Sequence, residues 1–232
     1  MGVLAVLYNM NGILFVRQLN MELSLMDSFW EIAFREKGKM WGEKPTLVAK
    51  ETALLFYKNN VKNILIPGIG YGRNAIPFIE LGMNVSGIEI SETAIHNAKK
   101  QFGSVVKIYE GSVLNMPFDK VLYGGIFCHA LIHLLSNNER SIFLEKCKEQ
   151  LAENGLMVFT AITKKASTYG VGSMVEKDQY RTKDGLDLFF YDEVSIQKEF
   201  ESYGLIGFDK IYEPRMEIEN SNIEFWKITC QK

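Results

Sequence analysis

Residues 64–74 read Ile64-Leu65-Ile66-Pro67-Gly68-Ile69-Gly70-Tyr71-Gly72-Arg73-Asn74, an apolar run that passes into three glycines at alternate positions. Such an apolar run is typical of a strand buried on both faces of a parallel sheet. Glycines let the backbone turn sharply and approach a ligand closely, and open parallel sheets bind ligands at the carboxyl ends of their strands. The stretch therefore predicts a ligand-binding turn between a buried strand and a helix.

The spacing of these glycines distinguishes between cofactors. A dinucleotide fingerprint has the pattern G-x-G-x-x-G, or a small residue at the third position, so that the helix packs closely on the strand. Here Arg73 occupies that third position. A bulky side chain there disfavours pyrophosphate binding, which makes an NAD(P)-dependent oxidoreductase the weaker alternative.

The flanking sequence alternates between predicted strands and helices. The predicted strands are 61–66, 84–90, 105–109, 120–127, 156–162, 208–212 and 223–230, and the predicted helices are 45–57, 74–81, 92–102, 136–151 and 192–203. Repeated β-α order indicates a parallel sheet with helices on both faces, and a closing pair of strands fits an antiparallel edge. The expected fold is α/β: a doubly wound, mostly parallel seven-stranded sheet with an antiparallel C-terminal strand.

No linker or internal repeat divides the chain, so we expect one domain over residues 26–232. Residues 1–25 are expected to form an appended N-terminal arm, with the natural start near Met21 or Met26. The apolar run Met1–Phe15 lacks a preceding basic residue and a cleavage site, and it is too short to span a membrane. Residues 163–191 show no clear period and are expected to form either an irregular lid over an acceptor or a plain surface insertion.

The overall composition excludes several function classes. The net charge is −2 and no stretch is strongly basic, which argues against nucleic-acid binding. The three cysteines, Cys128, Cys147 and Cys230, form no C-x-x-C pair, so neither a zinc site nor a disulfide framework is indicated. A reduced, cytoplasmic protein without a membrane partner is the simplest expectation.

A second signal is Glu89, which ends the strand that follows the Gly-rich turn. A carboxylate at this point can accept hydrogen bonds from both ribose hydroxyls of an adenosine-bearing cofactor. The alternative interpretation is an acidic residue that merely ends a strand.

A third signal is the loop 111–118, Gly-Ser-Val-Leu-Asn-Met-Pro-Phe, followed by Asp119 and a strand. The series of Gly-rich turn, acidic strand end and this loop resembles the motifs of class I S-adenosylmethionine-dependent methyltransferases over about residues 60–162. Pro67 resembles the thiopurine methyltransferases, and 72–74 is similar to the tellurite-resistance methyltransferases. The aromatic residues of Phe29-Trp30 and Trp41-Gly42 resemble the N-terminal segment that covers the cofactor in the thiopurine group.

This resemblance implies S-adenosylmethionine as the cofactor and assigns residues to it. The implied cofactor-binding residues are Gly68, Ile69, Gly70 and Gly72 at the methionine and ribose, Arg73 or Asn74 at the amino-acid end, Glu89 at the ribose, Ile90, Ser112 and Val113 at the adenine, Phe127 and Cys128 beneath the sulfonium, and Trp41 as cover. The chain departs from the family where an acidic residue often precedes the glycines, since it has Ile66. It also has Ser112 where Asp is frequent, although a hydroxyl still accepts a hydrogen bond.

The acceptor-binding residues are less well defined. The candidates are Trp30, His129, His133, Tyr169, Arg181 and Tyr191. For Trp30 and Trp41 the alternative is packing in the core. His129 is a weak candidate for a base or a polar wall. His129 and His133 have metal-ligand spacing, but Ala130 replaces the glutamate of an H-E-x-x-H helix and no third ligand is evident, so no metal is expected.

The expected reaction is direct displacement on a small-molecule acceptor. The sequence shows no convincing pair of nucleophile and base, which favours a thiolate or another soft, already ionised acceptor atom. A non-catalytic S-adenosylmethionine-binding module remains an alternative, because it would keep Glu89 and the glycines while its acceptor pocket is blocked under 163–191.

Overall fold

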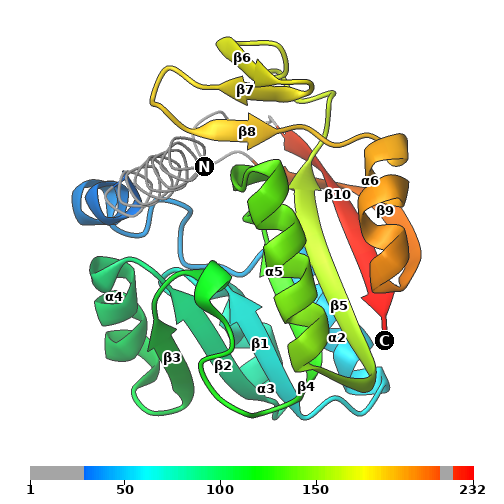
Figure 1. Ribbon diagram of the computed structural model, residues 1–232. Coiled ribbons are helices and arrows are strands. Elements are labelled where there is room, and N and C mark those ends of the chain that lie inside the picture. The colour runs from blue at the N-terminus through cyan, green and yellow to red at the C-terminus, as the bar shows by residue number, and fades with distance from the viewer. Residues whose placement is uncertain (1–28, 215–221) are drawn as a thin grey trace, which may run out of the picture.

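A seven-stranded sheet runs through the centre of the protein (Figure 1). The structure is a computed structural model that describes residues 29–214 and 222–232, so the expected arm 1–25 lies outside the described residues. The strand order is β3-β2-β1-β4-β5-β10-β9. The strands are β1 (Asn63–Pro67), β2 (Asn84–Glu89), β3 (Val106–Glu110), β4 (Tyr123–His129), β5 (Leu151–Ile162), β9 (Leu205–Pro214) and β10 (Asn222–Gln231).

The pairing of these strands confirms the predicted fold class. Strands β1 to β5 pair in parallel, whereas β10 is antiparallel to both β5 and β9. The helices are α2 (Leu47–Lys58), the 3₁₀ turn η1 (Arg73–Ala75), α3 (Ile76–Glu80), α4 (Glu92–Phe102), α5 (Asn137–Gln150) and α6 (Glu193–Phe200). Figure 1 shows α5 on one face of the sheet and α2 and α3 on the other. None of the helices described is long and apolar enough to cross a membrane.

The sheet has a separate hydrophobic core on each face. In β1, Ile64 and Ile66 pack with α2 and α3, whereas Leu65 packs with residues of α5 and α6. All three side chains are buried, because successive residues of a strand point to opposite faces and both faces are covered. Because helices cover both faces of the sheet, the carboxyl ends of the parallel strands are the part that remains open to a ligand.

The helix starts agree with the capping signals of the sequence. Ser91 caps α4, and Ser136 with Glu139 forms the capping box of α5. The helix predicted over 45–57 begins at Leu47 rather than at Pro45, because the Thr46 side chain accepts a hydrogen bond from Ala49 N and is the N-cap of α2.

The segment 163–191 differs from the expected irregular lid. It contains a three-stranded antiparallel sheet of β6 (Ser173–Glu176), β7 (Gln179–Arg181) and β8 (Asp187–Phe189), which stands above the main sheet in Figure 1. The expected irregular backbone was wrong, because these strands are short and β6 is exposed throughout, so they carry no alternation of apolar and polar residues. The role of the segment as a lid or a surface insertion stays a prediction.

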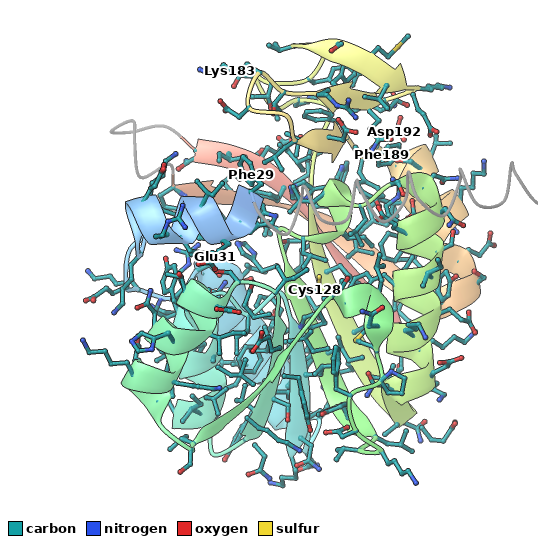
Figure 2. The ribbon with its side chains drawn as sticks, turned by 60° about the vertical axis from the view of Figure 1, so that its left-hand side comes forward. Phe29, Glu31, Cys128, Lys183, Phe189 and Asp192 are labelled. Atoms are coloured by element: carbon teal, nitrogen blue, oxygen red, sulfur yellow. The ribbon has the colours of Figure 1, made fainter. Side chains whose placement is uncertain are left out.

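Charged side chains attach this small sheet to the main domain. Lys164 Nζ lies 2.7 Å from Asp178 Oδ2 and 2.6 Å from Asp192 Oδ2. The guanidinium of Arg140, a buried residue of α5, stacks 3.9 Å from the centre of the Phe189 ring in β8. Figure 2 labels Phe189 and Asp192 at the base of the small sheet. Segment 163–191 is thus joined to α5 and to the start of α6.

Candidate active site

A cavity of about 1380 Å³ lies at the carboxyl ends of the parallel strands. Its walls include residues that follow β1, β2, β3 and β4, together with the N-terminal segment 30–47 and parts of β9 and β10. This volume exceeds the roughly 300–1,000 Å³ typical of a site for one small ligand. The cavity is therefore large enough for two small ligands side by side.

Most of the residues selected from the sequence meet at this cavity. Those that line it are Trp30, Trp41, Gly68, Ile69, Gly70, Arg73, Asn74, Glu89, Ile90, Ser112, Val113, His129 and His133. Those that lie elsewhere are Gly72, Phe127, Cys128, Tyr169, Arg181 and Tyr191.

The Gly-rich turn that follows β1 has backbone torsion angles that favour glycine. Gly68, Gly70 and Gly72 have φ values of +66°, +60° and +87°, a region that L side chains rarely adopt. A Cβ atom at Gly68 would also collide with Leu131, whereas at Gly70 it would meet only Phe34, at 3.6 Å. The turn thus leaves bare backbone facing the cavity.

Glu89 ends β2 and connects that strand to the turn. One carboxylate oxygen accepts a hydrogen bond from Gly70 N at 2.7 Å, and the other accepts from Ile90 N at 2.9 Å and Ser91 N at 3.0 Å. Burial raises the pKa of Glu89, while these three N–H donors act in the opposite direction. The side chain is thus a buried acceptor held in place at the cavity wall.

An aromatic cluster covers the turn from the N-terminal side. Trp41 and Tyr71 are stacked with 6.4 Å between ring centres, and Trp30 lies 6.0 Å from Trp41. The Tyr71 hydroxyl donates to Gly42 O at 2.8 Å and accepts from Trp41 N at 3.1 Å. Trp41 is 38% exposed, so its ring forms part of the cavity wall and not of the core.

Glu31 fixes the helical segment 29–37 to the start of α4. Its carboxylate accepts hydrogen bonds from Ser91 Oγ at 2.7 Å, from Thr93 N at 3.1 Å and from Thr93 Oγ1 at 2.5 Å. These hydrogen bonds, from Thr93 first and then Ser91, lower the pKa of Glu31. In Figure 2 Glu31 lies on the side of its helix that faces α4. The segment that carries Trp30 is thereby tied to the same strand end as Glu89.

Two histidines and Phe225 form the wall beyond β4. The half-buried His129 contacts Thr160 Oγ1 through Nδ1 at 2.9 Å, and its ring lies 6.0 Å from that of Phe225. The ring of His133 lies 6.1 Å from Phe225, and its Nδ1 is buried without a hydrogen-bond partner. Desolvation lowers the pKa of His129 to about 3, with Arg73 adding to the effect, and that of His133 to about 4. Both imidazoles are neutral at pH 7.

The remaining sequence-selected residues have other surroundings. Phe127 and Cys128 are buried in the two cores, on opposite faces of β4, and Cys128 lies within the sheet in Figure 2. Tyr191 is buried with its hydroxyl on Glu199, Tyr169 packs on Tyr180 and Phe190, Arg181 pairs with Asp187, and Gly72 faces Phe102. Within the described ranges, no group of three His, Cys, Asp or Glu side chains could hold a metal ion.

The sequence missed several residues that line the cavity. Tyr71 lies between the glycines of the turn, so its place in the motif could have marked it. Glu213 and Phe225 come from β9 and β10 and carry no local signal, because they reach the cavity only through the pairing of distant strands.

Comparison with known proteins agrees with this geometry. Residues 64–155 match the family model described as a methyltransferase domain, whereas no curated protein matches the chain. The fold is similar to that of 1,6-didemethyltoxoflavin-N1-methyltransferase from Burkholderia thailandensis, solved with 1,6-didemethyltoxoflavin and S-adenosylhomocysteine (14% identity, 92% of this chain and 89% of that chain, TM-score 0.70).

Two further structures share the fold. They are the glycopeptide N-methyltransferase MtfA (18% identity, 82% of this chain and 97% of that chain, TM-score 0.57) and TehB from Haemophilus influenzae (14% identity, 88% and 67%, TM-score 0.59). The domain match and the shared fold support an enzyme of the S-adenosylmethionine-dependent methyltransferase class. The bare turn beside a buried carboxylate would fit S-adenosylmethionine as the cofactor.

Proposed function

We propose that the protein transfers the methyl group of S-adenosylmethionine to a small-molecule acceptor with a soft nucleophilic atom. The observation that carries this proposal is the joining of Glu89 to the Gly-rich turn at one end of a cavity with room for two ligands. The cofactor would occupy this end, and the acceptor would occupy the end beyond β4.

The cofactor end offers a hydrogen-bonding group for each part of the ligand. We assign Gly68, Ile69 and Gly70 to the methionine and ribose, Glu89 to the ribose hydroxyls, Ile90, Ser112 and Val113 to the adenine, Arg73 and Asn74 to the amino-acid end, and Trp41 to the cover. An ionised carboxylate has about four lone-pair sites, and Glu89 uses three of them on backbone N–H groups. A site thus remains free for a ribose hydroxyl.

The acceptor end is apolar and uncharged. It is lined by Leu131, Ile162 and Phe225 beside His129 and His133. A histidine whose pKa lies near 3 binds protons weakly, so His129 is a poor general base at neutral pH. The acceptor atom must therefore reach the site as a good nucleophile already, which favours a thiolate or a similar soft atom over an alcohol.

The chain's own contribution to the reaction is alignment and exclusion of water. The cofactor supplies an activated methyl group on sulfur. The Gly-rich turn and Glu89 hold one reactant, while the wall around Phe225 holds the other, and fixed alignment of two reactants lowers the entropic part of the barrier. The aromatic cluster of Trp30, Trp41 and Tyr71 shields the turn from solvent.

Three broader assignments each have support of their own. The buried, unpaired cysteines Cys128, Cys147 and Cys230 support a reducing, cytoplasmic location. A likeness to the thiopurine and tellurite-resistance group is supported by the shared fold of TehB. Residues 26–232 are proposed as one domain, with 163–191 as the part that borders the acceptor through Thr168.

The test is calorimetric titration of the protein with S-adenosylmethionine and S-adenosylhomocysteine, with NAD as the control. We expect micromolar binding of both adenosyl ligands and none of NAD. Incubation with S-adenosylmethionine and a panel of thiol, selenium and tellurium acceptors should then yield methylated products by mass spectrometry. Binding without turnover of any acceptor would favour the non-catalytic module, and absence of adenosyl-ligand binding by folded protein would overturn the proposal.

A further inference from the structure

We propose that Glu213, on β9, is the counter-charge for the ammonium group of the cofactor's methionine part. This inference rests on the proposed function. Glu213 lines the cavity, and its side chain is only 7% exposed. Its strand, β9, is the edge strand on the opposite side of the sheet from β3.

The ligand itself creates the need for such a residue. The amino-acid end of S-adenosylmethionine carries an ammonium and a carboxylate, and burial of an unpaired charge is costly. The turn that follows β1 supplies no acid, because Ile66 is buried in the core and residues 67–72 are uncharged. The counter-charge must come from another part of the cavity wall.

Among the described residues, three acids line the cavity. The Glu43 side chain is 76% exposed and pairs with Lys39 at 2.8 Å. Glu89 is held at the opposite side of the turn by three backbone N–H groups. Glu213 is the remaining acid, and burial raises its pKa, so a bound cation would stabilise its ionised form.

The surroundings of Glu213 place it at the amino-acid end. Its Oε1 accepts a hydrogen bond from Val48 N at 3.3 Å, at the start of α2. Two residues earlier, Thr46 donates through N at 3.0 Å and Oγ1 at 3.1 Å to Asn74 Oδ1. Because Asn74 and Arg73 directly follow the Gly-rich turn, Glu213 belongs to the same polar cluster as the end of that turn.

Arg73 and Glu213 together suit a zwitterion. Each influences the pKa of the other through its charge, yet their side chains form no ion pair within 4.0 Å. Arg73 is held by a 2.7 Å hydrogen bond from Nη1 to Trp41 O. Opposite charges that face one cavity without contact leave room for a carboxylate beside Arg73 and an ammonium beside Glu213.

A purely structural role is the competing explanation, since Glu213 also accepts a hydrogen bond from the first turn of α2. Glu213→Gln separates the two roles, because glutamine keeps an acceptor oxygen for Val48 N and loses the charge. The ligands are S-adenosylhomocysteine and 5′-methylthioadenosine, which lacks the amino-acid end. The matched control is Glu43→Gln, an acid at the rim of the same cavity.

We expect Glu213→Gln to weaken S-adenosylhomocysteine binding by about 10- to 100-fold, as for a lost charge-assisted hydrogen bond, and to leave 5′-methylthioadenosine binding unchanged. The Glu43→Gln variant should bind both ligands like the unaltered protein. Calorimetry measures the affinities, and thermal unfolding confirms that the variant is folded. If Glu213→Gln does not fold, Glu213→Asp, which keeps the charge and shortens its reach, should show a smaller loss that is still confined to S-adenosylhomocysteine.

Equal weakening of both ligands would show that Glu213 acts only through the position of α2, and unchanged binding of both would place the ammonium elsewhere. Either result overturns this inference and leaves the proposed function intact. Failure of the unaltered protein to bind either ligand would instead overturn the proposed function.

Discussion

The carboxylate of Glu89 accepts a hydrogen bond from the backbone N–H of Gly70, with 2.7 Å between the oxygen and the nitrogen. This contact joins the end of β2 to the turn that follows β1. Because the strands are adjacent and parallel, with Pro67 opposite Ile88, the carboxylate and the turn form one wall of the cavity. The predicted cofactor site depends on this relationship.

Replacement of Glu89 by alanine should weaken S-adenosylhomocysteine binding by about 1–3 kcal/mol, because the charge-assisted hydrogen bond to the ribose is lost. Calorimetric titration measures the change. Glu110→Ala is the matched control, since Glu110 ends the neighbouring strand opposite Glu89 but is exposed. Equal affinity of the Glu89→Ala variant and the unaltered protein would contradict the placement of the site.

Glu31→Gln should lower the stability of the protein by about 0.5–1.5 kcal/mol at neutral pH, because the hydrogen bonds to Ser91 and Thr93 lose their charged acceptor. The folded-state pKa of Glu31 lies below its usual value of 4.5. The stabilisation is therefore complete above pH 4.5 and is lost as the pH falls through the folded-state pKa. Thermal unfolding from pH 7 to pH 3 measures this window.

The control for Glu31 is Glu36→Gln, a change at an exposed position of the same helical segment. It should leave the melting temperature unchanged over the whole range. A stability difference between Glu31→Gln and the unaltered protein that persisted undiminished to pH 3 would show that the carboxylate charge is not what fixes the helix to α4.

His133→Phe should make the protein more resistant to acid. The folded-state pKa of His133 is about 4, below the usual 6.5, so the unfolded state binds a proton between these values and the folded state does not. Stability is therefore lost as the pH falls below 6.5. The variant should avoid about 2–3 kcal/mol of the loss that the unaltered protein suffers between pH 7 and pH 4.5.

Urea unfolding at the two pH values measures that difference. His96→Phe is the control, because His96 is the third histidine of the chain and is exposed on α4. An acid-induced loss of equal size in the His133→Phe variant and the unaltered protein would mean that His133 is solvated in the folded state.

The three cysteines should resist alkylation in the native protein. Each is buried, and burial raises the pKa of Cys230 to about 12 and those of Cys128 and Cys147 above their usual value. The thiolate is the reactive form, so iodoacetamide at pH 8 should add no mass to folded protein and three groups after unfolding in urea. Native modification of Cys128 would show that the end of β4 opens to solvent.

Local sequence predicted the larger part of the fold, and most of the residues that it selected line one cavity. The capping residues Ser91 and Ser136 marked helix starts correctly, because a cap bonds to backbone groups only a few residues away. The alternation of elements predicted the mostly parallel sheet and the closing pair of strands predicted its antiparallel edge, whereas the strand order comes from the tertiary structure. The small sheet β6–β8 was missed, since its strands are only three or four residues long and β6 is exposed throughout, so no alternation of apolar and polar residues marks them.

The sequence by itself determined that the Gly-rich turn and Glu89 lie side by side. They stand at the carboxyl ends of two consecutive parallel strands, and these ends lie on the same side of the sheet. Only the tertiary structure brought Phe225 and Glu213 to the same cavity. Their positions depend on the register of β10 against β5, where Phe225 lies opposite Ile162, and of β9 against β10. Strands β5 and β10 are separated by the small sheet, α6 and β9, so the residues around Phe225 and Glu213 carry no sign of the strand ends that they meet.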